Sequence, residues 1–172
     1  MRNENITLDV NVNKYAINIP AKTIVAGFAG IGKSTAGKKY PNLFIDMESS
    51  DYHWITDEGG NKYLNPEWPI NYVNAILKAT ETIKIGEPFY VLTSTHSEVL
   101  EEFKKRQIYY MVVIPKTKSV ALKRYKERGS SPKFIKSMEN NFDKYIQDVK
   151  NSSAFLIYTT DMYLEDIFIP SK

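Results

Sequence analysis

Residues 24–35 read IVAGFAGIGKST, and this stretch decides the fold. From Gly27 to Ser34 it matches the pattern G-x-x-x-x-G-K-[ST] at every fixed position. A short apolar run precedes it, and residues that can open a helix follow it. The pattern and its setting therefore predict a strand, a phosphate-binding loop and a helix in direct succession.

The chemistry of such a loop explains its residue types. Glycines let the backbone adopt positive φ and approach an anion closely, so that successive N–H groups point at phosphate oxygens above a helix N-terminus. Lys33 supplies a mobile charge for β- and γ-phosphates, and the Ser34 hydroxyl is a suitable Mg²⁺ ligand. The residues expected to hold the nucleotide are Gly27, Gly30, Ile31, Gly32, Lys33, Ser34 and Thr35.

Length and composition limit the remaining possibilities. The chain has 172 residues, 42% of them hydrophobic, which suits a single domain with a sizeable core. A net charge of +3 does not indicate nucleic-acid binding. With no cysteine and two histidines, any metal is expected to be Mg²⁺ held by oxygen. No leader or long apolar run is apparent, so we expect a cytoplasmic protein without a membrane partner.

The hydrophobic pattern predicts one α/β domain over residues 1–172. Alternation between residues 6 and 19 indicates an N-terminal β-hairpin within residues 1–20. Five apolar runs predict a mainly parallel five-stranded sheet, at residues 22–26, 43–45, 89–92, 109–114 and 154–158. Helical spacing predicts flanking helices at residues 34–39, 65–80, 98–106, 119–128, 132–149 and 162–167.

An acidic segment follows the second of these five strands. Asp46, Glu48 and Asp51 lie where open α/β sheets bind their ligands, beyond the carboxyl end of a strand. Asp46 is expected to reach the phosphate end of the site, either through a Mg²⁺-bound water or by accepting a proton from the attacking group. Glu48 and Asp51 either bind the acceptor substrate or serve as helix caps and solvated loop charges.

Three further side chains are open to two interpretations. Trp54 and Trp68 either stack on a nucleotide base or pack in the core. His96 follows the strand at residues 89–92, and it either contacts a phosphate or caps the next helix.

A pair of arginines stands out in the helix at residues 119–128. Arg124 and Arg128 are one turn apart on one face, and only four of the 23 basic residues are arginines. The planar guanidinium suits phosphate better than a lysine ammonium does. The alternative is an ordinary solvated basic helix.

The order of these features resembles the nucleoside monophosphate kinases over roughly residues 22–169, and the chain also resembles small kinase-like proteins of phages and their bacterial hosts. The resemblance implies that residues 116–133 form a lid and that Arg124 and Arg128 meet the transferring phosphoryl group. Residues 93–96 read TSTH, where many adenylate-type kinases have Asp-Gly-x-Pro-Arg. The pair Asp46 and Glu48 instead resembles the Asp-x-Asp of shikimate-type kinases.

The leading hypothesis is therefore Mg²⁺-ATP-dependent phosphoryl transfer to a nucleoside or deoxynucleoside monophosphate, a small-molecule partner. One alternative is a kinase of another small hydroxylated substrate, with Asp46 as base. The other is a regulatory protein that binds a nucleotide without catalysis. The sequence does not indicate an oligomeric state.

Overall fold

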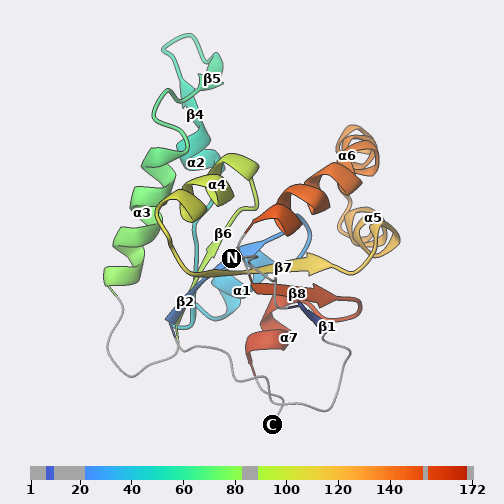
Figure 1. Cartoon of the computed structure of the whole chain (residues 1–172). Helices are drawn as coiled ribbons and strands as arrows, with labels where there is room; N and C mark the ends of the chain where they lie inside the picture. The colour runs from blue at the N-terminus through green and yellow to red at the C-terminus, as the bar shows by residue number, and fades with distance from the viewer. Residues whose placement is uncertain (1–6, 10–21, 83–88, 153–154, 170–172) are drawn as a thin grey trace.

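The computed structural model describes residues 7–9, 22–82, 89–152 and 155–169, which form a parallel sheet covered by helices (Figure 1). Its strands lie in the order β1-β8-β7-β2-β6-β3, and every neighbouring pair is parallel. The bounds are β1 (Thr7–Asp9), β2 (Lys22–Gly27), β3 (Phe44–Asp46), β6 (Phe89–Thr93), β7 (Tyr110–Pro115) and β8 (Phe155–Thr159). The five-stranded parallel sheet predicted from the sequence is confirmed.

The sixth strand, β1, is the described part of the expected N-terminal hairpin. It pairs in parallel with β8 at the sheet edge, with Thr7 opposite Leu156. The rest of the expected hairpin, residues 1–6 and 10–20, lies outside the described residues.

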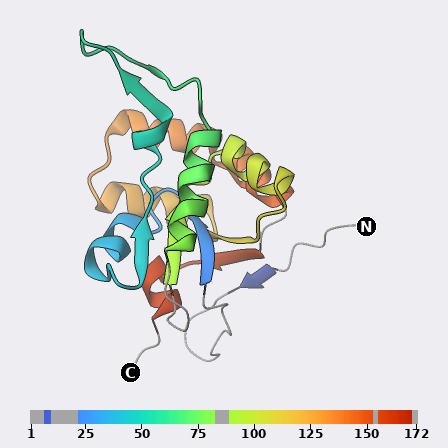
Figure 2. The same ribbon diagram turned by 90° about the vertical axis from the view of Figure 1, so that its left-hand side faces the viewer.

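Helices cover both faces of the sheet (Figure 2). One face packs against α3 (Ile70–Glu81), α4 (Ser97–Lys105), α5 (Lys118–Glu127) and α6 (Pro132–Asn151). The other packs against α1 (Lys33–Lys39) and α7 (Leu164–Phe168). Neighbouring strand residues separate accordingly: Ile24 and Val91 belong to the first core, whereas Val25 and Leu92 belong to the second. Burial on both faces explains why these strands read as continuous apolar runs.

The helix boundaries follow local signals in the sequence. Thr117 begins α5 by accepting a hydrogen bond from Val120 N at 3.3 Å, and Ser131 begins α6 in the same way from Phe134 N at 3.2 Å. Gly129, at φ +73°, separates the two helices. No helix in the described ranges is long and apolar enough to cross a membrane.

A projecting hairpin was not predicted. After the short helix α2 (Ser50–His53), β4 (Trp54–Thr56) and β5 (Lys62–Leu64) pair antiparallel and extend away from the sheet (Figures 1 and 2). In the turn between these two strands, Asp57 accepts a hydrogen bond from Asn61 N at 2.8 Å. Three exposed residues per strand carry too little hydrophobic pattern to predict the strands themselves.

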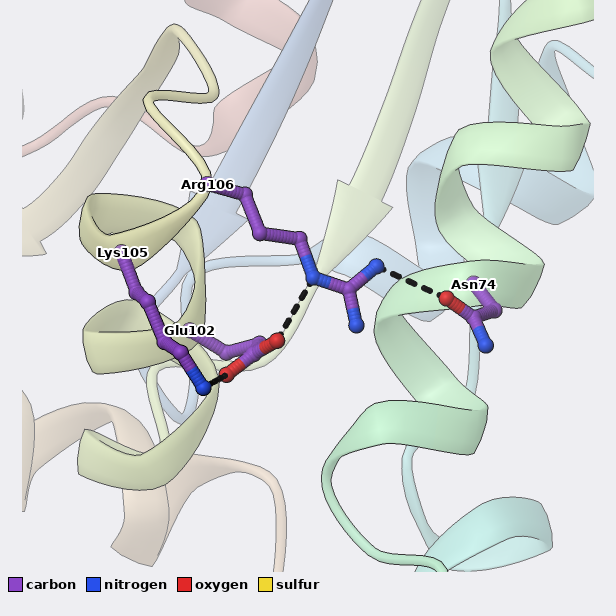
Figure 3. A network of polar contacts seen from close by, with 4 residues as sticks. All are labelled: Asn74, Glu102, Lys105 and Arg106. Atoms are coloured by element: carbon purple, nitrogen blue, oxygen red, sulfur yellow. Dashed lines mark hydrogen bonds and ion pairs between the residues drawn. The ribbon is translucent and has the colours of Figure 1, made fainter.

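A polar network joins α3 to α4 (Figure 3). Arg106 donates from Nε to Glu102 Oε1 at 2.6 Å and from Nη1 to Asn74 Oδ1 at 2.8 Å. Lys105 lies 3.9 Å from the same glutamate. This contact fixes the far end of α4, whose first turn lies beside the site described next.

Candidate functional site

The loop between β2 and α1 has the form that the sequence predicts. Gly30 and Gly32 have positive φ, at +81° and +97°, a region that side chains disfavour. Gly27 is required for a different reason, because a Cβ there would lie 2.7 Å from Ile31 Cγ2 and 2.9 Å from Lys33 Cδ. The loop therefore needs all three glycines, two for conformation and one for close packing.

Two tyrosines from distant segments support this loop. Tyr125 of α5 is fully buried, its ring lies against Gly30, and its hydroxyl donates to Ala29 O at 3.0 Å. Burial raises the pKa of Tyr125 to about 12, so it remains a neutral donor. Tyr163, just before α7, lies beside Gly32. Sequence reasoning missed both residues, because only the tertiary fold brings them to the loop.

Lys33 lies at the start of α1, and its Nζ donates a hydrogen bond to Gly27 O, at the start of the loop, at 2.8 Å. Burial lowers the pKa of Lys33, and the charges of Asp46 and Glu48 oppose that change. The ammonium is thus bonded to the loop and lies within reach of the charges of the acidic segment.

Asp46, the last residue of β3, lies directly against α1. A Cβ on Gly37 would come within 2.9 Å of Asp46 Cβ, so a glycine permits this close packing. Burial raises the pKa of Asp46, while a hydrogen bond from Ser34 and the charge of Lys33 act in the opposite direction. Its Oδ1 atom is buried without a hydrogen-bond partner in the described structure. A hydroxyl and an unsatisfied carboxylate oxygen are donors that suit Mg²⁺, so the expected Mg²⁺ pair, Ser34 and Asp46, fits the ion chemically.

The other acidic residues differ in position. Glu48 lines the cavity described below, and it also accepts hydrogen bonds from Ser50 N at 3.3 Å and Ser50 Oγ at 3.2 Å at the start of α2. Asp51 is exposed in the first turn of α2 and is not among the cavity-lining residues.

An aromatic stack borders this side of the site. His53 lies between Trp54 and Trp68, with ring centroids 4.6 and 4.3 Å away. Trp68 stacks in turn on Tyr72 at 5.4 Å. Trp54 is 44% exposed at the outer end of the stack, and neither tryptophan is among the cavity-lining residues.

His96 meets this stack edge-on and also lines the cavity. It occupies the N-cap position of α4, yet its side chain makes no capping hydrogen bond, and its Nδ1 lies 2.8 Å from Ser94 Oγ. Burial lowers the pKa of His96, and the charge of His53 lowers it further. A neutral imidazole is therefore favoured, with one nitrogen engaged by Ser94.

The two arginines of α5 have different surroundings. Arg124 is buried; it stacks on Tyr163 at 4.6 Å and donates from Nη2 to Thr160 O at 2.9 Å and to Met162 O at 2.8 Å. Arg128 is exposed; it packs over the Tyr125 ring at 5.1 Å and donates to a nearby serine. Both line the cavity, but much of the hydrogen-bonding capacity of Arg124 is taken by the segment before α7.

The phosphate loop, Glu48, His96 and the two arginines of α5 line one cavity of about 940 Å³. It extends from the phosphate loop to the ends of β3 and β6 and beneath α5 and α6. Side chains that sequence reasoning missed also line it: Ser49, Ser94, Thr95, Ser97, Glu98, Phe134, Met138, Tyr145, Asp148, Tyr163 and Glu165. Those of α6 recur at helical spacing, the pattern from which the sequence predicts the helix itself.

No protein-family model and no curated protein matches this chain. Among solved structures, it is similar to the SH3-kinase fragment of tight junction protein 3, at 13% identity and a TM-score of 0.45 over 85% of this chain and 52% of that one. It is also similar to shikimate kinase from Bacteroides thetaiotaomicron, at 18% identity and a TM-score of 0.43 over 81% and 85% of the two chains. An uncharacterized protein from Eubacterium ventriosum gives 16% identity and a TM-score of 0.42 over 84% and 92%. The chain thus spans about half the length of the tight junction fragment, and similarities this distant carry no information about substrate.

Proposed function

We propose that this chain is a phosphotransferase that uses Mg²⁺-ATP to phosphorylate a small hydroxylated acceptor. The supporting observation is that the phosphate loop, Lys33 and Glu48 line a single cavity that continues past them to Ser94 and His96 beyond the end of β6. The γ-phosphate end of a nucleotide would then face a space large enough for a second molecule. A protein that only binds a nucleotide has no need of that space.

At the phosphate end of the site, we assign a separate role to each group. The N–H groups of the glycine loop would surround the β-phosphate, and Lys33 would move from Gly27 O to bridge the β- and γ-phosphates. Ser34 and Asp46 would hold Mg²⁺, which when bound neutralises phosphate charge and aligns the two phosphates. Tyr125 would keep the loop in its binding conformation through Ala29.

At the acceptor end, the attacking oxygen is a substrate hydroxyl. Its bond to the γ-phosphorus forms as the bond from that phosphorus to the β–γ bridging oxygen breaks, and ADP leaves. The hydroxyl proton passes to a carboxylate and then to water. Glu48 lines the cavity and Asp46 does not, so we assign proton acceptance to Glu48 and retain Asp46 for the metal.

The lid proposed for residues 116–133 contains α5 and the start of α6. Arg128, exposed at the cavity, would contact the transferring phosphoryl group. Arg124 would act indirectly, by fixing the segment at residues 160–163 beside the nucleotide loop. The nucleoside monophosphate predicted from the sequence is one member of the acceptor class.

The test is ADP formation by the purified protein with Mg²⁺, ATP and a panel of small hydroxylated acceptors, including the common ribo- and deoxyribonucleoside monophosphates. We expect acceptor-dependent turnover that Lys33→Ala abolishes. ATP binding without turnover on any acceptor would instead identify a regulatory nucleotide-binding protein.

A further inference from the structure

Most of the charges around the cavity are divided between its two ends; the exception is the lining carboxylate of Glu165 in α7, which is paired with Lys39 at 3.1 Å. The lining cations are Lys33, Arg124 and Arg128, and all belong to the phosphate loop or to α5. The end formed by the first turn of α4 and the end of α6, together with the segment after β3, carries three lining carboxylates: Glu48, Glu98 and Asp148. Among the described residues that line the cavity, none at that end is a cation.

Neighbouring contacts place these carboxylates on the same side. Glu98 and Glu48 both raise the pKa of His96, in opposition to burial, while the charge of Lys33 lowers it, so this imidazole lies within reach of the carboxylates and of the phosphate-loop lysine. Asp148 lines a second, smaller pocket together with Ser97, the residue that precedes Glu98. The helices α4 and α6 that carry these residues contact each other (Figure 1).

The carboxylates are not neutralised by ion pairs between described residues. Glu98 lies in the first turn of α4, where it complements the partial positive charge of the helix terminus and leaves less of it for an anion. The protein as a whole carries a net charge of +3, so this acidity is local. An acceptor that brings a phosphate or carboxylate here would meet like charges, and Lys33 of the phosphate loop is the lining cation whose charge also reaches His96.

We propose that the acceptor is a small hydroxylated amine, of the amino sugar or amino alcohol class, and not a nucleoside monophosphate. Its ammonium group pairs with Glu98 and Asp148, and its hydroxyl is directed toward Lys33. The hydroxyls of Ser49, Ser94, Thr95 and Ser97 line the same end and suit a polyhydroxylated compound. This assignment rests on the proposed phosphotransferase function. The ammonium stays protonated throughout, and the transferred group goes from ATP to the substrate oxygen as described above.

The experiment compares acceptors matched in shape but not in charge. ADP formation is measured with amino sugars and amino alcohols such as 2-amino-2-deoxyglucose, with their neutral parents such as glucose, with the corresponding acids such as glucuronate, and with nucleoside monophosphates. We expect the amines to give the highest kcat/KM. If a neutral or anionic class gives the highest value, the inference is wrong but the phosphotransferase function stands. If ATP binds and no acceptor is phosphorylated, both are wrong.

Charge-removing variants test the residues. In Glu98→Gln and Asp148→Asn, the KM for the amine should rise about fivefold each, the size expected for a partly exposed ion pair, with the KM for ATP unchanged. Glu101→Gln is the matched control, because Glu101 lies on the same helix but lines only the smaller pocket. Equal changes in all three variants, or no change in the first two, would contradict the proposed pairing.

Discussion

Replacing Gly30 by alanine tests how the phosphate loop is held. Gly30 has φ +81°, and a Cβ there would lie 2.8 Å from Cε1 of Tyr125, a fully buried ring whose hydroxyl is bonded to Ala29 O. Gly60 provides a matched control, because it has φ +83° but nothing within 4 Å of the position that a Cβ would occupy. Both substitutions incur backbone strain, and only the first also forces a steric overlap.

The expected magnitudes differ accordingly. Left-handed backbone strain costs roughly 1–2 kcal/mol for a residue with a side chain, so Gly60→Ala should lose about that much. Overpacking adds about 1–3 kcal/mol, so Gly30→Ala should lose roughly 2–5 kcal/mol in total. For a protein of this size each kcal/mol lowers Tm by about 2–4 °C, a difference that thermal unfolding followed by circular dichroism resolves.

Two results would refute this account of the loop. Equal Tm losses for Gly30→Ala and Gly60→Ala would show that Tyr125 does not confine the loop. The second refuting result would come from the Tyr125→Leu background. There, Gly30→Ala should lower the free energy of unfolding by about 1–3 kcal/mol less than it does in the parent. An equal loss in both backgrounds would show that the two substitutions are additive and that Tyr125 does not cause the overlap. ATP affinity, measured by titration calorimetry, should fall for Gly30→Ala and stay unchanged for Gly60→Ala.

Three further outcomes are expected. Asp46→Asn should lower kcat far more than it weakens ATP binding, and near-parental rates at saturating Mg²⁺ would place Asp46 outside the site. Arg124→Lys should lower Tm, because lysine cannot bond both Thr160 O and Met162 O in the same way, whereas Arg128→Lys should leave Tm nearly unchanged and lower turnover; the reverse pattern in paired melting and rate assays would refute the roles assigned to them. Burial lowers the pKa of His96 below 6.5, so the unfolded chain binds a proton on this residue more readily than the folded chain does. The free energy of unfolding from this residue should therefore be fully present above pH 6.5 and decline as the pH falls below it. Urea unfolding at a series of pH values should show a weaker decline for His96→Asn, and an unchanged decline would contradict the lowered pKa.

The sequence was sufficient for the phosphate loop and the sheet because both depend on local patterns. The glycines of the loop are specified by backbone geometry, and the strands are buried on both faces, so each leaves a continuous apolar run. Asp46 could be singled out as a candidate because it directly follows such a run.

The remaining features depend on tertiary proximity. Arg124 and Tyr125 are buried in a helix whose sequence is otherwise rich in lysine, so its pattern does not reveal which side faces the core. Glu98 and Asp148 are 50 positions apart by number and share a cavity only because α4 packs against α6. The hairpin formed by β4 and β5 has strands of three exposed residues, too short to show a period.

The most direct test of the central claim, that the loop at residues 27–35 binds ATP for phosphoryl transfer, is ³¹P NMR of Mg²⁺-ATP incubated with the protein and the acceptor panel. We predict that the γ-phosphate resonance is replaced by that of a phosphate ester as ADP accumulates. Lys33→Ala, whose fold is checked by circular dichroism, should leave the ATP spectrum unchanged. An unaltered ATP spectrum with the parent protein, or equal conversion by the parent and Lys33→Ala, would contradict the claim.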